Sequence, residues 1–317
     1  MKSIFTSSCI ALFAILPLAH SQDRTEQHRK LLTDAQKIIF LGDSITYGGN
    51  YVANFETWLQ IAFPERQFSV INMGLGSETV SGLSEKGHAG GRFPRPDLHT
   101  RLDSILTKTK PDLVFACYGM NCGIQMPFDQ NRFEKYQQGL IKLKTKVEAT
   151  GAKIIFITPP YYDSQVNKSK AYYTDVLAKY SAWLVSQRAK GWNVIDLNSH
   201  MTETIQAKRK SDPKFTVQKD AVHPNAAGHW IMTQPILKWF GDDQAADSQS
   251  VEDMLRQHRL PAKIAVLEFK RMAVLRNAWL TEAGHKRPGV PKGLPLAKAK
   301  AQAEALTKEI EALCKVE

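Results

Sequence analysis

The chain has 317 residues, of which 43% are hydrophobic and 23% are charged, and this balance excludes disorder over most of its length. The formal net charge is +11, but basic and acidic residues are interspersed and no aromatic residues interleave with them, so nucleic acid is not the expected partner. This length can form one large α/β domain with a smaller appendage, or two modest domains.

The first 21 residues have the organisation of a cleavable signal peptide. Lys2 supplies a positive charge, Ile10–Leu18 is apolar but too short to span a bilayer, and Ala19-His20-Ser21 offers small residues to a signal peptidase. A membrane anchor or a buried helix is the alternative interpretation. The pattern predicts a secreted or periplasmic protein without stable membrane insertion.

Three cysteines, Cys117, Cys122 and Cys314, follow that segment. An odd number cannot form a closed disulfide framework, and a domain of this size does not need one. No cluster of cysteine and histidine has the spacing of a zinc site. We therefore expect neither a metal nor a cofactor.

Short apolar runs predict the strands of a buried sheet, and helical segments alternate with them. The predicted strands are residues 37–42, 68–72, 112–118, 153–158 and 193–197. Apolar residues three or four positions apart predict helices between the later strands, with faces formed by Phe133, Tyr136, Leu140 and Leu143, and by Tyr173, Val176, Leu177, Tyr180 and Leu184. This alternation predicts a mostly parallel sheet covered on both faces, with its ligand site beyond the carboxyl ends of the strands.

The composition changes after Phe240. Residues 251–280 and the segment from Leu296 predict helices, separated by a stretch rich in Gly and Pro. We therefore divide the mature chain into a main domain, residues 22–248, and a C-terminal helical hairpin, residues 249–317. The hairpin can be a packing element, a dimer contact or a wall of the pocket; its amphipathic stripe favours packing, and the oligomeric state stays open.

The first strand runs into Gly42-Asp43-Ser44. A serine just past a buried strand, at the start of a possible helix, carries its hydroxyl at the functional edge of the sheet, where helix amides can stabilise negative charge. The same tripeptide is also ordinary turn and cap chemistry.

The second strand runs into a glycine-rich turn, residues 72–79, whose backbone amides can approach a substrate oxygen. The third ends in Tyr118-Gly119-Met120-Asn121-Cys122-Gly123, which places an amide side chain beside flexible backbone. Each of these segments is equally compatible with a simple turn.

The segment Asp220-Ala221-Val222-His223 is the most informative of the four. A carboxylate three residues before a histidine can hold one imidazole nitrogen and leave the other free to take a proton from a hydroxyl. Capping of the following helix is the alternative for these two side chains, and Asn225 is a further predicted cap.

Together the four segments resemble the SGNH (GDSL-type) hydrolase family in order and in separation, over about residues 37–240. Gly42-Asp43-Ser44 matches the first block of that family, Gly119-Met120-Asn121 the third, and Asp220 to His223 the last. The resemblance implies a flavodoxin-like three-layer α/β/α fold with a mostly parallel five-stranded sheet. It also implies a serine esterase.

In the mechanism that the resemblance implies, Ser44 attacks an acyl carbonyl, His223 takes its proton, and Asp220 orients His223. The oxyanion would be held by the backbone amide of Ser44, an amide of the second block and the side chain of Asn121.

The chain departs from the family pattern at two positions. Ser77 stands where glycine is usual, with Gly76 one residue earlier, and since the donor is a backbone N–H either can supply it. Cys122 stands where the family commonly has Asp, and it is a rival nucleophile, although no histidine lies near it in the sequence.

A long loop, residues 84–96, follows the second block and is expected to border the site. In it Arg92 or Arg95 can bind a carboxylate or sulfate of a substrate, or simply be solvated. Export, polar loops and no obvious apolar lid favour an acetyl ester on a carbohydrate. The alternatives are a lysophospholipid or thioester substrate, acyl transfer to another sugar, and a catalytically silent glycan-binding protein.

Overall fold

The computed structural model describes residues 16–315, and within them a single parallel sheet has the strand order β2-β1-β3-β4-β5. Each strand lies inside one of the apolar runs identified in the sequence, so the predicted five-stranded parallel sheet is confirmed. The strands are β1 (Lys37–Gly42), β2 (Ser69–Asn72), β3 (Leu113–Cys117), β4 (Lys153–Ile157) and β5 (Asn193–Ile195).

The register of the sheet brings the carboxyl ends of the strands to one edge. Gly42 pairs with Cys117, and Cys117 pairs with Ile157. Strand residues beyond the first of each strand are buried, because helices cover both faces.

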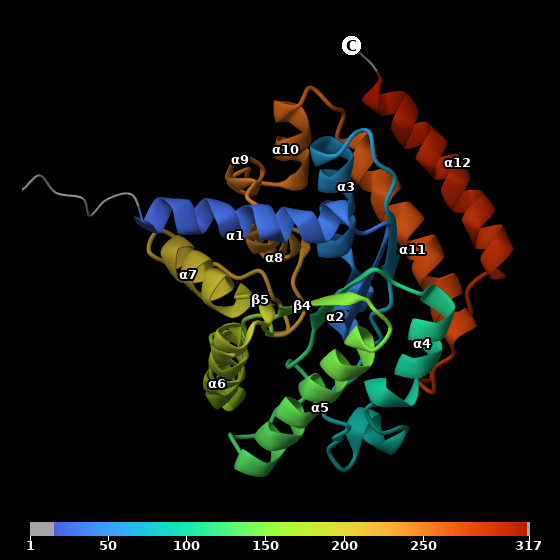
Figure 1. Cartoon of the computed structure of the whole chain (residues 1–317). Coiled ribbons are helices and arrows are strands. Elements are labelled where there is room, and N and C mark those ends of the chain that lie inside the picture. Colours follow the sequence, from blue (N-terminus) through green and yellow to red (C-terminus); the bar gives the residue numbers. More distant parts are fainter. Residues whose placement is uncertain (1–15, 316–317) are drawn as a thin grey trace, which may run out of the picture.

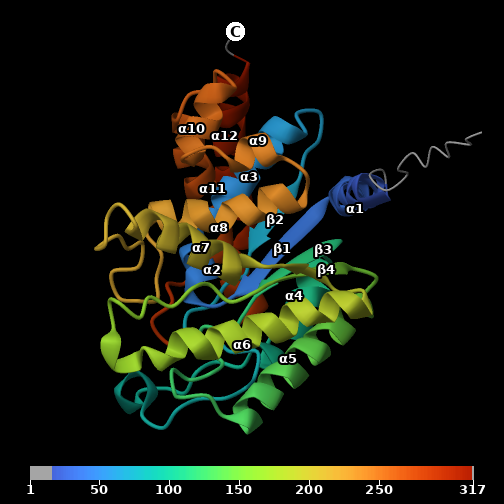
Figure 2. The ribbon, with the colours of Figure 1, turned by 90° about the vertical axis from the view of Figure 1, so that its left-hand side faces the viewer.

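Helices on the two faces complete a three-layer α/β/α arrangement, which Figure 2 shows edge-on. On one face α3 packs against α8, and the side chains of Asn54 and Thr233 join them by a hydrogen bond of 3.3 Å. On the other face α5 packs against α6, where the rings of Tyr136 and Tyr180 stack at 4.5 Å. The helices of these layers are α3 (Asn50–Ala62), α4 (Leu102–Thr109), α5 (Gln130–Glu148), α6 (Tyr172–Ser186), α7 (Leu197–Arg209) and α8 (Ala226–Trp239).

The C-terminal segment forms the predicted helical hairpin (Figure 1). Helix α11 packs against its partner α12, against α3 and against the edge strand β2. Arg271 of α11 forms an ion pair of 2.7 Å with Glu56 of α3. The helices that follow α8 are α9 (Asp243–Ala246), α10 (Val251–Gln257), α11 (Lys263–Ala283) and α12 (Leu296–Cys314), and α11 and α12 form the hairpin. The division into domains at residue 248 stays a prediction.

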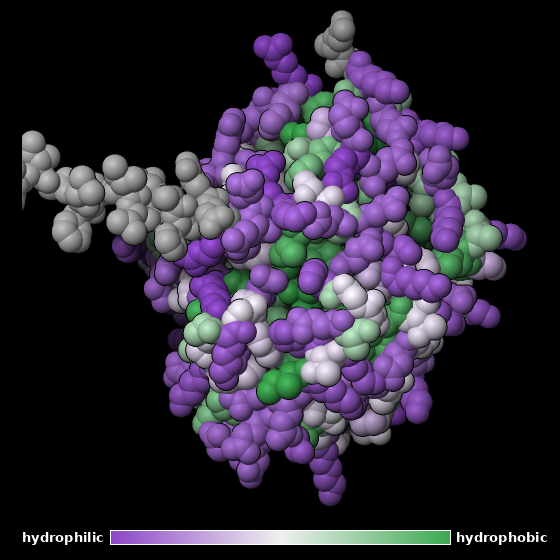
Figure 3. All heavy atoms as spheres, in the orientation of Figure 1, coloured by the Kyte–Doolittle hydropathy of each residue, from purple (hydrophilic) through white to green (hydrophobic). Residues whose placement is uncertain are grey.

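Helix α1 (Leu16–Thr33) precedes the first strand, and its His28 ring stacks on Trp239 at 3.5 Å. Of the predicted signal peptide, residues 1–15 lie outside the described residues, so that prediction stays one. Within residues 16–315 no helix is both long and apolar enough to cross a bilayer. On the face drawn in Figure 3, hydrophilic side chains cover most of the surface, with apolar patches between them.

Candidate active site

The nucleophile candidate sits where β1 ends and the short helix α2 (Ser44–Gly48) begins. Asp43 caps this helix, its Oδ1 accepting a hydrogen bond from the backbone N–H of Ile45 at 3.0 Å. A Cβ on Gly42 would lie 2.0 Å from the Thr46 hydroxyl oxygen, so only glycine fits at this turn. The turn leaves the Ser44 side chain partly exposed at the carboxyl edge of the sheet.

Ser44 meets the two residues predicted to act with it. Its Oγ lies 2.8 Å from Nε2 of His223, and Nδ1 of His223 lies 2.6 Å from Oδ2 of Asp220. With the proton on Nδ1 facing the carboxylate, Nε2 is the acceptor for the serine hydroxyl. The structure therefore brings together three side chains from two segments about 180 residues apart.

The carboxylate of Asp220 is held in its charged form. Burial would raise its pKa, but hydrogen bonds from the His223 ring and from the backbone N–H groups of His223 and Val222 more than offset this and lower the pKa. The side chains of His223 and Asp220 are 51% and 56% exposed. The site is therefore open to solvent and accessible to a large substrate.

The loop that carries His223 is tied to the body of the protein. Gln218 donates to the backbone carbonyls of Tyr161 at 2.6 Å and of Val222 at 3.0 Å. Asn225 caps α8, as the sequence predicts, by accepting from the N–H of Gly228 at 2.9 Å. These contacts fix the position of the imidazole relative to the end of β1.

The second block leaves backbone donors available near Ser44. Asn72 fixes the turn, since its Oδ1 accepts from the N–H of Gly74 at 2.9 Å and its Nδ2 donates to the carbonyl of Thr46 at 2.6 Å. Ser77 has a φ of +68°, a conformation that favours glycine. Among the described residues the amides of Ser44, Gly76 and Ser77 have no acceptor, so the choice between Gly76 and Ser77 stays open.

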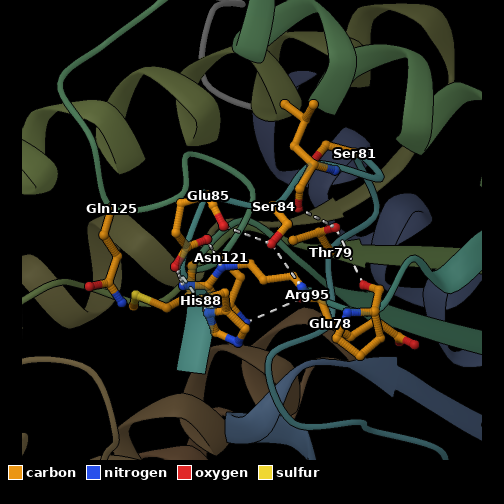
Figure 4. A network of polar contacts seen from close by, with 12 residues as sticks. Glu78, Thr79, Ser81, Ser84, Glu85, His88, Arg95, Asn121 and Gln125 are labelled. Atoms are coloured by element: carbon orange, nitrogen blue, oxygen red, sulfur yellow. Dashed lines mark hydrogen bonds and ion pairs between the residues drawn. The ribbon is translucent and has the colours of Figure 1, made fainter. Parts of the chain in front are cut away.

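Asn121, at 5% exposure, sits between a buried cation and a backbone carbonyl (Figure 4). Its Oδ1 accepts from Nη1 of Arg95 at 2.8 Å, and its Nδ2 donates to the carbonyl of Glu78 at 3.2 Å. One hydrogen on Nδ2 is left for an oxyanion.

The two candidate arginines of the long loop differ in their surroundings. Arg92 is exposed, and its Nε donates to the carbonyl of Ala89 at 2.8 Å. Arg95 is buried, and it directs its guanidinium to Glu85 and Asn121. Of these two arginines, Arg92 is the one that presents its guanidinium to solvent.

A buried ion pair that the sequence does not reveal lies behind Asn121. Nε of Arg101 lies 2.6 Å from Oε1 of Glu78, and its Nη2 lies 2.7 Å from Oε2. The hydroxyl of Tyr118 donates to the same carboxylate at 2.6 Å. Glu78 and Tyr118 lie in the second and third segments identified in the sequence, but no local pattern links them to Arg101, which is 23 residues from Glu78.

The rival nucleophile has a different environment. Cys122 is 0% exposed, and burial raises the pKa of its thiol to about 12. A neutral, enclosed thiol does not suit nucleophilic attack. Cys117, Cys122 and Cys314 are all free.

The C-terminal hairpin reaches the site from the side of β2. The guanidinium of Arg276 lies 4.1 Å from the ring centre of Tyr47, three residues after Ser44. From the segment between α11 and α12, Nε of Arg287 lies 3.2 Å from where a Cβ on Gly76 would stand. The hairpin therefore contacts both the nucleophile helix and the second block.

Comparisons with known proteins identify the family of this chain. A family model described as the GDSL-like Lipase/Acylhydrolase family matches residues 40–231. An acetylxylan esterase of Geobacillus stearothermophilus is 24% identical over 229 residues, which are 65% of this chain and 94% of that protein.

Solved structures show the same fold. A catalytic mutant of Axe2, an acetylxylan esterase from Geobacillus stearothermophilus, matches with a TM-score of 0.50 and 22% identity, over 65% of this chain and 94% of that one. A gut microbial diltiazem-metabolizing enzyme matches with a TM-score of 0.51 and 24% identity, over 65% of this chain and 47% of that one.

Proposed function

The chain belongs to the GDSL-like lipase/acylhydrolase family and is an ester-hydrolysing enzyme, and we propose that it is exported and removes acetyl groups from a carbohydrate through Ser44, His223 and Asp220. The observation that carries the catalytic assignment is the continuous line of contacts from the serine Oγ to imidazole at 2.8 Å and from imidazole to carboxylate at 2.6 Å.

The reaction proceeds in two steps. His223 takes the proton of the Ser44 hydroxyl as Oγ attacks the acetyl carbonyl, and the resulting imidazolium returns that proton to the sugar oxygen as the ester bond breaks. Water then attacks the acetyl-enzyme, with His223 again acting as base, and acetate leaves with Ser44 restored. Asp220 keeps the imidazole oriented and stabilises its charged form.

The negative charge of each tetrahedral intermediate falls on the former carbonyl oxygen. The donors for it are the backbone N–H of Ser44, an N–H of the second block, from Gly76 or Ser77, and Nδ2 of Asn121. Each preformed donor of this kind is worth about 3–4 kcal/mol in the transition state.

Two observations support an acetylated glycan as the substrate. The half-exposed side chains of His223 and Asp220 lie on an open surface, which admits a polymer. The curated relative covered over 94% of its length is an acetylxylan esterase.

Release of acyl groups from a series of esters tests the proposed substrate. We expect the highest kcat/KM on acetyl esters, both as p-nitrophenyl acetate and as acetylated xylo-oligosaccharides, with a steep decline beyond four carbons. A preference for chains of eight carbons or more would contradict the acetyl-esterase assignment and favour a lysophospholipase. Acylated acceptor with little free acetate would indicate transfer in place of hydrolysis.

Mass spectrometry of the protein recovered outside the cytoplasm tests the export. A mature chain that begins at Gln22 is the expected result. An intact N-terminus on a protein retained in the cytoplasm would contradict it.

A further inference from the structure

Arg95 is a buried cation that the reaction scheme leaves without a role. It is 8% exposed, and its Nη1 donates to Oδ1 of Asn121 at 2.8 Å. Removing a guanidinium from water is costly unless its donors find good partners. The partners of Arg95 therefore indicate what this side chain does.

Glu85 holds the guanidinium in a two-point contact. Nε of Arg95 lies 2.7 Å from Oε2 of Glu85, and its Nη2 lies 2.8 Å from Oε1 (Figure 4). Burial would raise the pKa of Glu85, but the hydrogen bonds from Arg95, a backbone N–H and His88, together with the charge of Arg95, more than offset this and lower it, so the carboxylate is charged. The backbone N–H of Arg95 also donates to Oγ of Ser84 at 2.9 Å. The plane of the guanidinium is thereby fixed.

A fixed guanidinium dictates which way the Asn121 carboxamide faces. Arginine has donors and no acceptor, so only the oxygen of the amide can face it. The NH₂ group must then face the other way, where one hydrogen bonds to the carbonyl of Glu78. A cation at the amide oxygen also polarises the group and makes its N–H a stronger donor.

The carbonyl of Glu78 is itself held in place. The side chain of Glu78 forms the buried two-point ion pair with Arg101, and Nη2 of Arg101 also donates to the carbonyl of Met73 at 2.7 Å. Asn121 thus lies between two anchored groups, one on each end of its amide.

We propose that the Arg95–Glu85 pair is the positioning device of the oxyanion hole, which orients Asn121 and does not bind substrate. The proposal rests on the proposed role of Asn121 as a donor to the oxyanion. Donors aligned before the reaction contribute most to the transition state, so their misalignment affects the chemical step.

The expected signature is a change in kcat without a change in KM. We expect Arg95→Met to lower kcat for p-nitrophenyl acetate by about 10- to 100-fold while KM stays within about twofold. This decrease in kcat is smaller than the one expected when an oxyanion donor is itself removed. Arg95→Lys keeps a charged donor but lacks the two-point contact of a guanidinium, so its kcat should lie between those of the parent and of Arg95→Met. Lys86→Met removes an exposed cation from the same loop and leaves both constants at the parent level.

A double-mutant cycle with Asn121→Ala separates positioning from substrate binding. If Arg95 acts through Asn121, Arg95→Met in the Asn121→Ala background changes kcat by less than about twofold. A rise in KM of equal size in both backgrounds would show that Arg95 contacts the substrate, and the proposal would be wrong.

Folding and the proposed function are checked separately. Melting temperatures identify variants that fail to fold. If Arg95→Met is one of them, Glu85→Gln, which keeps the size of the side chain and one acceptor oxygen but removes the counter-charge of Arg95, must lower kcat by about 3- to 10-fold at unchanged KM. A parent protein that neither hydrolyses p-nitrophenyl acetate nor is inactivated by a fluorophosphonate would refute the esterase itself. A reactive parent with undiminished Arg95→Met and Glu85→Gln would refute only the positioning role.

Discussion

His229 lies one turn into α8, six residues after His223, and it is nearly enclosed. Its ring is parallel to that of Tyr51 at 6.0 Å, and its Nδ1 has no hydrogen-bond partner among the described residues. Burial, with a smaller contribution from the charge of His223, lowers its pKa to about 4 from 6.5. The folded protein therefore keeps this imidazole neutral.

The lowered pKa of His229 determines how the stability of the protein changes with pH. Between about pH 6.5 and pH 4 the unfolded chain binds a proton that the folded chain does not, so stability declines as the pH falls through this window, by about 3 kcal/mol in all. His229→Phe removes this decline. Urea unfolding at pH 7 and pH 4 measures this difference. Between these pH values the free energy of unfolding of the parent should decline by about 3 kcal/mol more than that of His229→Phe. His258→Phe, a control at an exposed position, should decline as much as the parent. Equal losses in all three proteins would contradict the shift.

The sequence predicts individual site residues where they lie in local motifs. It does not predict residues whose role depends on a contact with another part of the chain. Ser44, Asn121, Asp220 and His223 each follow a strand or precede a helix in a recognisable block, and the structure brings them to one edge. Arg95 resembled a free substrate-binding group, since its partner Glu85 lies ten residues earlier across an irregular loop.

The sequence predicts the bounds of helices and strands more accurately than it predicts side-chain contacts. Where an observed bound differs from the predicted one, a local hydrogen bond explains the difference. Strand β5 ends at Ile195, not at 197, because Asp196 caps α7 by accepting from the N–H of Ser199 at 3.2 Å. Between α8 and the hairpin the chain forms the short helix α9, which was not predicted from the sequence, because Asp242 accepts from the N–H of Ala245 at 2.9 Å. The apolar stripe of the hairpin predicted a packed helix but not its partners.

The hairpin docks on α3 through a buried charge cluster as well as apolar contact. Arg271 lies 2.7 Å from carboxylate oxygens of both Glu56 and Glu268. Burial, followed by the nearby Glu56, raises the pKa of Glu268 to about 8. One cation therefore contacts two enclosed carboxyl groups, of which Glu268 is mostly protonated at neutral pH.

Arg271→Met leaves those carboxyl groups without a counter-charge and should lower the free energy of unfolding by about 3–5 kcal/mol. Lys270→Met, on the exposed side of the same helix, should change it by less than about 0.5 kcal/mol. Chemical denaturation measures both. An Arg271→Met protein as stable as the parent would show that the cluster does not anchor the hairpin.

Over the whole molecule, a parallel sheet collects the carboxyl ends of β1, β2 and β3 at one edge, and the loop that precedes α8 adds His223 there. The hairpin packs along the outer strand β2, and its Arg276 contacts Tyr47 of α2. The buried sheet and the helices around it thus hold Ser44 and His223 together, while the imidazole remains half exposed to solvent. This arrangement explains why segments far apart in the sequence can act together.

The proposed reaction depends on the Ser44 hydroxyl being the group that attacks the ester. The most direct measurement is the initial rate of acetate release by Ser44→Ala against the parent, at equal concentration and with melting temperatures compared. We predict a rate below about one thousandth of the parent's with a melting temperature within about 2 °C. A folded Ser44→Ala protein that releases acetate at a rate near the parent's would contradict it.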